Sequence, residues 1–180
     1  MKNGLFILMA LTLAACSSSR NAVFTQRFYK QSGLTADELK KVQFYVDKDI
    51  VLQRSLNEGE SSVREGKVVY SGGKKVQQII IRSGTKGALV FMPKDDRFGI
   101  SFNANDDSKY LMFGPNAKND NKYNLLAEEW KQKYGVVTYG GERWTTPASS
   151  AFATLYIQYS GHETNKYHSR VEQGRSVGKH

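Results

Sequence analysis

Two pairs of neighbouring aspartates are the residues whose types and spacing could do chemistry in this 180-residue chain: Asp95-Asp96 and Asp106-Asp107, in adjacent expected connections. Two carboxylates that flank a glycosidic bond act as acid and base in glycan hydrolysis. With nearby asparagines they could instead offer oxygen ligands to calcium, although the EF-hand ligand pattern is absent. Because Asp and Asn also begin turns and keep hairpin ends soluble, turn formation is the simplest interpretation.

Histidine chemistry is confined to the C-terminal end of the chain. His162, His168 and His180 are the only histidines, and all lie in a polar segment that lacks apolar periodicity. The spacing of His162 and His168 misses the i, i+4 pattern of helical zinc ligands. No G-x-S-x-G turn is present to offer a serine nucleophile to a histidine base. The sequence therefore indicates no metal, no cofactor and no catalytic residue.

Rings and cations supply the candidate binding residues. Lysines and an arginine surround expected hairpin ends, and aromatic residues gather near the last hairpin. Exposed rings beside cations bind sugars and bases, whereas the commoner roles are a solvated rim and an ordinary aromatic β core. The candidates are Lys74, Lys75, Lys86, Lys94, Arg97, Trp144 and Tyr156.

The first sixteen residues have the pattern of an export signal. Lys2 gives a positive start, residues 5–13 form an apolar run, and Ala14 and Ala15 precede Cys16, the only cysteine. The apolar run is shorter than the roughly 20 residues that a membrane-spanning helix needs. Residues 1–15 are therefore expected to be removed as a signal peptide.

The tetrapeptide Leu13-Ala14-Ala15-Cys16 resembles the lipobox of bacterial lipoproteins. In that family the cysteine is acylated with two or three chains, such as palmitate, and becomes the mature N-terminus on a membrane. Ser17 follows the cysteine, and in proteobacterial lipoproteins the absence of aspartate there favours the outer membrane over the inner one. The resemblance implies an outer-membrane lipoprotein that faces the periplasm. The alternative is an ordinary secretory signal with an incidental cysteine.

The charge balance points to anionic partners outside the cytoplasm. The chain has 26 Lys and Arg against 17 Asp and Glu, and loss of Lys2 with the signal leaves a formal charge of +8. For an exported protein, the expected anionic partners are lipid headgroups or acidic glycans, and not nucleic acid. If Cys16 is acylated, no thiol remains for a disulfide or a metal site.

Short strands separated by turns dominate the region 34–160, which we expect to form a single β-rich domain. Thr35 and Glu38 predict a capping box for one short helix at 34–41. About nine strands follow, and glycine pairs at 72–73 and 140–141 predict tight hairpins. Residues 98–104 alternate apolar and small or polar residues, as a half-buried strand does. The expected fold is mainly β: a small antiparallel β-barrel or a two-sheet sandwich with one short N-terminal helix.

Three segments leave alternatives open. Residues 16–33, with basic and aromatic side chains, read as the lipidated cysteine and a tether, or as an arm that packs on the domain; packing is favoured for the aromatic residues. Residues 123–134 fit helix and strand about equally. Residues 161–180 are expected to be a disordered polar tail.

The resulting hypothesis is a membrane-anchored periplasmic lipoprotein that acts as a non-enzymatic binding or envelope-assembly module. Its partner would be an envelope protein or an acidic glycan or lipid, and its membrane contact would be the lipid anchor. The alternative is a glycan hydrolase built on the paired aspartates. A third possibility, a barrel that carries an apolar ligand as lipocalins do, lacks the glycine-x-tryptophan pattern expected near the start of that family.

Overall fold

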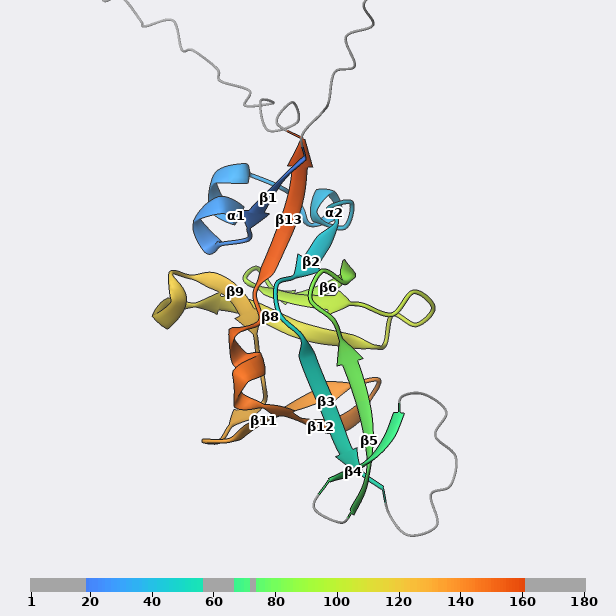
Figure 1. Ribbon diagram of the computed structural model, residues 1–180. Helices are drawn as coiled ribbons and strands as arrows, with labels where there is room; N and C mark the ends of the chain where they lie inside the picture. Colours follow the sequence, from blue (N-terminus) through green and yellow to red (C-terminus); the bar gives the residue numbers. More distant parts are fainter. Residues whose placement is uncertain (1–18, 57–66, 72–73, 161–180) are drawn as a thin grey trace, which may run out of the picture. The chain divides into compact units, whose positions relative to one another are not determined.

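The computed structural model describes residues 19–56, 67–71 and 74–160, which form two antiparallel sheets (Figure 1). The seven-stranded sheet has the order β1 (Ser19–Val23), β13 (Leu155–Ser160), β2 (Phe44–Val46), β6 (Lys86–Lys94), β7 (Arg97–Ser101), β8 (Tyr110–Asn116) and β9 (Lys122–Leu125). The six-stranded sheet has the order β10 (Glu129–Trp130), β11 (Tyr134–Tyr139), β12 (Glu142–Pro147), β3 (Ile50–Ser55), β5 (Lys74–Ile81) and β4 (Lys67–Ser71). The mainly β, sandwich-like prediction is confirmed, and neither sheet closes into a barrel.

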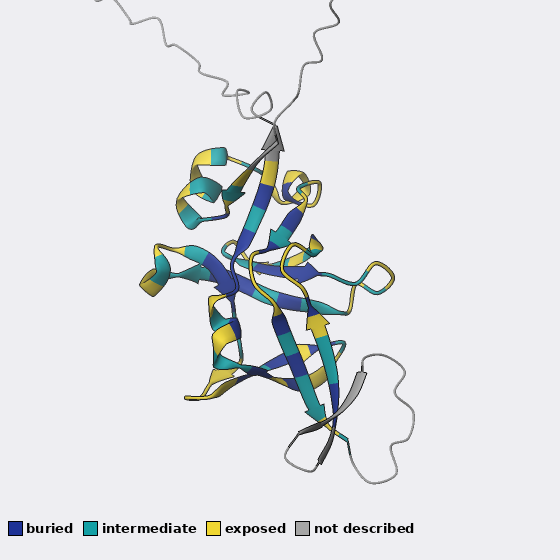
Figure 2. Ribbon diagram, in the orientation of Figure 1, coloured by how far each residue is buried: buried dark blue, intermediate teal, exposed yellow. Residues whose placement is uncertain are grey.

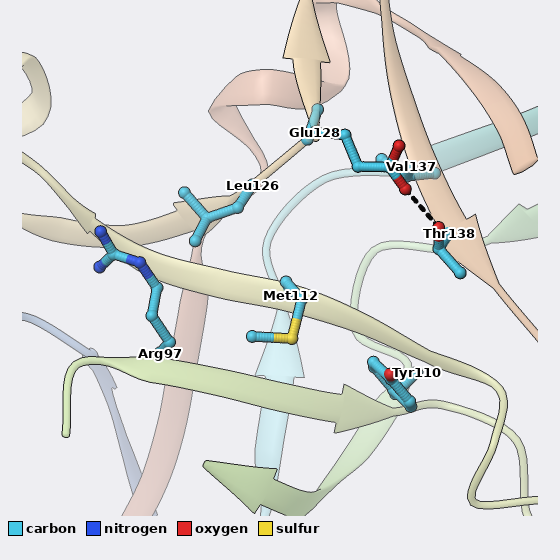
Figure 3. Close-up of a pocket in the computed structure, with 8 residues that line it drawn as sticks. Arg97, Tyr110, Met112, Leu126, Glu128, Val137 and Thr138 are labelled. Carbon is cyan, nitrogen blue, oxygen red and sulfur yellow. Dashed lines mark hydrogen bonds between the residues drawn. The ribbon is translucent and has the colours of Figure 1, made fainter. Parts of the chain in front are cut away.

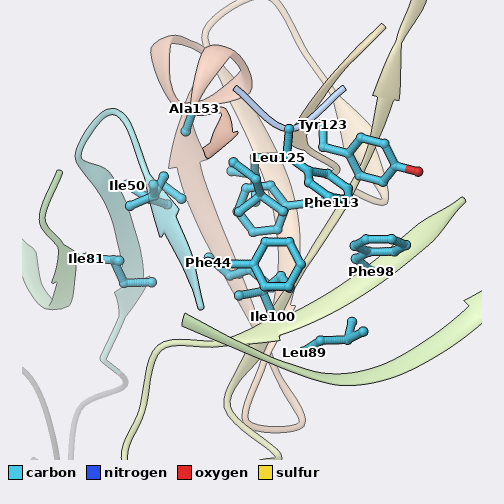
Figure 4. Close-up of a cluster of buried hydrophobic side chains, with 14 of the residues drawn as sticks. Phe44, Ile50, Ile81, Leu89, Phe98, Ile100, Phe113, Tyr123, Leu125 and Ala153 are labelled. Atoms are coloured by element: carbon cyan, nitrogen blue, oxygen red, sulfur yellow. The ribbon is translucent and has the colours of Figure 1, made fainter. Parts of the chain in front are cut away.

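Residues 21–158 make one compact unit. Within it, buried apolar side chains from both sheets form the core (Figures 2 and 4). Phe24 is fully buried there, and its ring lies 5.0 Å from Tyr123 and 5.3 Å from Phe44, centre to centre. Such edge-to-face contacts add to the free energy that ring burial supplies. Residues 21–33 therefore pack on the domain, which begins earlier than residue 34.

Two short α-helices follow β1, where the sequence predicted one. The capping box of α2 (Ala36–Leu39) is confirmed: the Glu38 amide donates to Thr35 Oγ1, and the Thr35 amide donates to Glu38 Oε2. Helix α1 (Gln26–Ser32) begins at Thr25, whose hydroxyl accepts from the Phe28 amide. The Tyr123 hydroxyl donates to Gln26 Oε1 over 2.6 Å, and burial raises the pKa of Tyr123, which keeps this donor protonated. Two 3-10 turns, η1 (Ala117–Asn119) and η2 (Ala148–Phe152), complete the helical elements of the described residues.

The hairpin predictions hold where the structure describes them. β11 and β12 are joined by Gly140 and Gly141, whose φ angles of 60° and 75° suit the tight turn that a two-residue hairpin requires. β4 and β5 pair up to Ser71 and Lys74, as the predicted hairpin around 72–73 needs. The ambiguous segment 123–134 holds strands β9 and β10 and no helix. Strand β8 continues through Gly114 and Pro115 to Asn116.

Strand β7 departs from the alternation predicted for 98–104. It ends at Ser101, and every residue from Phe98 to Ser101 is buried. Phe98 and Ile100 belong to the core, while the ring of Phe91 from β6 covers the opposite face at Gly99. Both faces of this strand are therefore covered.

Candidate functional site

A groove of about 310 Å³ lies between strand β8, the start of β7, and strand β11 (Figure 3). Apolar side chains line much of it, and its charged groups are an arginine and a glutamate. Its lining residues are Arg97, Tyr110, Met112, Leu126, Ala127, Glu128, Val137 and Thr138. A pocket of this composition, with few polar groups, has the general form of a ligand site.

The alternation of β8 supplies one wall of the groove. Leu111 and Phe113 are buried in the core, so Tyr110 and Met112 project from the other face of the strand. The Leu126 amide donates to the Met112 carbonyl over 2.8 Å, which holds the connection between β9 and β10 against β8. Met112, a flexible and polarisable side chain, can adjust to the shape of a bound group.

Arg97 closes one end of the groove. Its Nη1 donates to the Asp96 carboxylate over 3.0 Å and to the Asp96 carbonyl over 3.2 Å. The guanidinium passes over Gly114, where an added Cβ would lie only 2.8 Å from Nη1. Glycine at 114 therefore gives Arg97 the space to lie across the neighbouring strand. The adjacent donors Nε and Nη2 have no hydrogen-bond partner among the described residues.

Glu128 lies on the other side of the groove, beside β11 (Figure 3). Its Oε1 accepts a short hydrogen bond from the Thr138 hydroxyl, and its Oε2 lies 3.4 Å from Arg143 Nη2. The backbone amide of Glu128 also donates to the Val136 carbonyl over 2.8 Å. These contacts hold the Glu128 carboxylate in place, whereas Arg97 keeps two donors, Nε and Nη2, that are unpaired within the described part of the chain.

The predicted basic residues are not gathered into one patch. Lys86 and Lys94 stand at opposite ends of β6, about 26 Å apart for a strand rise of 3.3 Å per residue. Lys74 and Lys75 belong to β5 in the other sheet, and the structure does not describe their side chains. Of the five predicted cations, the groove contains Arg97.

Trp144 and Tyr156 occupy different environments. Trp144 is buried at 3% exposure; its Nε1 donates to the Tyr139 carbonyl, and the Arg54 guanidinium lies 5.3 Å from its ring centre. The tryptophan is therefore a core residue and not an open stacking platform. Tyr156 is half-buried and stacks on Tyr45 of β2, with ring centres 5.2 Å apart.

The two aspartate pairs lie at opposite ends of β7. Asp95-Asp96 forms the turn before this strand and Asp106-Asp107 the connection after it, which separates them by about 16 Å of strand. The acid and base of a glycosidase stand about 5–9.5 Å apart. Asp106 accepts from the Ser108 hydroxyl and amide, which lower its pKa, and lies 3.3 Å from Lys109 Nζ. The geometry favours the turn-forming role of these carboxylates.

Some predicted residues cannot be placed. Cys16, the predicted signal peptide and the three histidines lie outside the described residues. In the described part of the chain, no three His, Cys, Asp or Glu side chains gather as a metal site would require. None of the helices described there has the length and apolarity to cross a membrane.

No protein-family model matches this chain, and comparison with curated proteins and with solved structures finds no match either.

Proposed function

We propose that the protein is a lipid-anchored binding module of the bacterial cell envelope, which holds a partner in the groove between β8 and β11. The lipobox-like Leu13-Ala14-Ala15-Cys16 supports the anchor and the periplasmic, outer-membrane location. The observation that carries the binding role is the groove itself, which has a volume of about 310 Å³ and a largely apolar lining. Arg97 lies at its end, and the donors Nε and Nη2, which are free among the described residues, suit a partner with acceptor oxygens.

Binding without catalysis is the reading that the geometry of the described residues supports. Arg97 and Glu128, the charged groups of the groove, are engaged in ion pairs at 3.0 Å and 3.4 Å. An ion-paired arginine positions a ligand well, but a guanidinium is a poor proton donor. The groove therefore suits recognition of a partner that combines apolar and acceptor groups.

Site-specific photo-crosslinking in the intact envelope tests the binding role. A photoreactive amino acid at the exposed rim position Glu128 should give a discrete adduct with one partner. The same amino acid at Asn105, an exposed turn residue between β7 and β8, is the matched control and should give none. Equal adducts from both positions, or none from Glu128, would contradict a role for the groove.

A further inference from the structure

Strand β11 has an edge that its neighbours cover only in part. On one side β12 pairs with the whole strand, from Tyr134 to Tyr139. On the other side β10 pairs with Gly135 and Val136 alone. Beyond Val136 no strand of the described chain pairs with this edge. An unpaired edge is a template for another extended chain.

The backbone of Thr138 points to this open edge. The Val136 carbonyl accepts from the Glu128 amide on the outer side of β11, and peptide groups of alternate residues point to the same side of an antiparallel strand. The tight turn at Gly140 and Gly141 gives the same assignment, because the flanking Tyr139–Glu142 pair is hydrogen-bonded and the Thr138–Arg143 pair is not. The N–H and C=O of Thr138 therefore face outwards, with no partner among the described residues.

The groove runs beside this edge. Val137 and Thr138 line it from β11, Met112 and Tyr110 from β8, and Leu126 from the connection to β10 (Figure 3). A chain that paired with Thr138 would point every second side chain to the same face, because strand side chains alternate. The apolar lining would receive a side chain from that face.

We infer that the groove binds an extended peptide segment, which adds a strand to β11 at Thr138, places an apolar side chain against Met112 and Leu126, and brings an acidic group to Arg97. Main-chain pairing supplies affinity and side-chain pockets supply specificity in this mode of recognition. The acidic group follows from Nε and Nη2 of Arg97, adjacent donors that match a carboxylate. This inference deepens the proposed function by naming the partner's chemistry, and it rests on that proposal.

The matched variants Thr138→Pro and Thr138→Ala test the strand addition. Proline removes the outward N–H, which makes no bond within the described residues, and proline is tolerated at strand edges. Alanine keeps the N–H and removes the side chain together with its hydrogen bond to Glu128. The probes are two fluorescent N-acetylated heptapeptides of alternating valine and threonine, one with a central glutamate and one with a central lysine.

Fluorescence polarisation with the full chain in mild detergent should show binding of the glutamate probe. Thr138→Pro should weaken binding of this probe about tenfold, because it removes one hydrogen bond and distorts the strand edge. Thr138→Ala should weaken binding by less than about threefold. Arg97→Gln should remove the preference for the glutamate probe over the lysine probe. In the wild-type chain, the Thr138 amide should become protected from hydrogen exchange when the glutamate probe is added.

The inference is overturned if neither probe binds, if both Thr138 variants bind equally well, or if the Thr138 amide gains no protection. Should Thr138→Pro fail to fold, the exchange and Arg97→Gln measurements still decide. A specific crosslink at Glu128 together with failure of the peptide probes would leave the binding role standing and reject only the peptide as partner.

Discussion

At the scale of single residues, rings lie over glycines of neighbouring strands. An added Cβ at Gly99 would lie 2.4 Å from the ring of Phe91, and one at Gly135 would lie 2.5 Å from the ring of Trp130. Both pairs are cross-strand partners in register. Glycine weakens a strand, and an aromatic partner that covers the bare backbone compensates for that weakness.

The Phe91–Gly99 pair predicts a non-additive mutation cycle. Gly99→Ala should destabilise the protein by about 1–2 kcal/mol, because the new methyl group displaces the ring. Phe91→Ala should cost about 1 kcal/mol through the lost cover of Gly99 and the lost contact with Tyr110. The double variant should fall short of the sum by about 1 kcal/mol, because the clash is gone. Urea unfolding measures all three, and strict additivity would contradict the contact.

Asp106 predicts a local source of acid sensitivity. The Ser108 hydroxyl and amide hold its pKa below the ordinary 3.8 in the folded protein. The unfolded chain then binds more protons between the folded pKa and 3.8, so this contribution to stability is present above 3.8 and is lost as pH falls through the folded pKa. Asp106→Asn should therefore flatten the fall in unfolding free energy at acidic pH.

Urea midpoints at several pH values from 3 to 6 provide the measurement. Asp107→Asn is the matched control, since the Asp107 carboxylate makes no hydrogen bond or ion pair in the described part of the chain. An unchanged acid slope in Asp106→Asn would refute the assignment.

At the scale of elements, the connection between β1 and α1 contributes Phe24 to the core. Its ring contacts those of Phe28, Tyr29, Phe44, Phe98 and Tyr123. Phe24→Ala should destabilise the protein by about 3–5 kcal/mol, the usual cost of a large aromatic truncation in a core. A chain that starts at residue 34 should lose its cooperative thermal transition. Val23→Ala, at a 46% exposed position next door, is the control and should change stability little. A cooperative transition in the truncated chain would show that the helical segment is dispensable.

Sequence patterns correctly predicted those structural elements that depend on interactions between residues close together in the chain. The capping box of α2 and the glycine hairpin between β11 and β12 depend on residues within a few positions of one another, so a single sequence carries them. Helix α1 was missed because it has only seven residues and its first turn has no acidic residue. Its helical state depends on packing against Phe98 and Tyr123, which are distant in the chain.

Of the residues that line the groove, the sequence predicted only Arg97 as a binding residue, because the groove forms where distant segments meet. Tyr110 and Met112 belong to the apolar run 110–113, which reads as a core strand, and nothing near them in sequence marks one face as open. Thr138 carries no chemical signature in the sequence, since the role proposed for it follows from where β10 ends. Gly114 leaves the space that Arg97 occupies, but a glycine in the sequence does not show which side chain lies over it.

At the scale of the whole molecule, the positive charge is spread over separate places. Lys86 and Lys94 lie at opposite ends of β6, and Lys74 and Lys75 belong to β5 of the other sheet. A lipid-free chain should therefore bind anionic vesicles weakly and lose binding as salt shortens the Debye length. Lys86→Ala and Lys94→Ala should each change binding by a similar small factor in co-sedimentation. Salt-independent binding, or loss through one lysine alone, would contradict a diffuse attraction.

The lipobox-like sequence predicts the chemistry of the mature N-terminus. Intact-mass measurement should show a chain that begins at acylated Cys16, because signal cleavage in the lipoprotein family precedes the modified cysteine. Cys16→Ser should accumulate as the unprocessed precursor or be released from the membrane. Alanine at Ser18, which leaves the tetrapeptide intact, is the control for effects of substitution near the signal. A mature chain with another first residue would reject the anchor.

The contrast between Trp130 and Trp144 has a spectroscopic consequence. Trp130 is 38% exposed on β10, beside the open edge of β11, and Trp144 is 3% exposed in the core. The folded protein should therefore emit from two populations, one quenched by acrylamide and one shielded from it. A ligand beside β11 should alter only the quenched population, whereas unfolding should merge the two. Trp130→Phe would leave a protein whose intrinsic fluorescence follows the core alone.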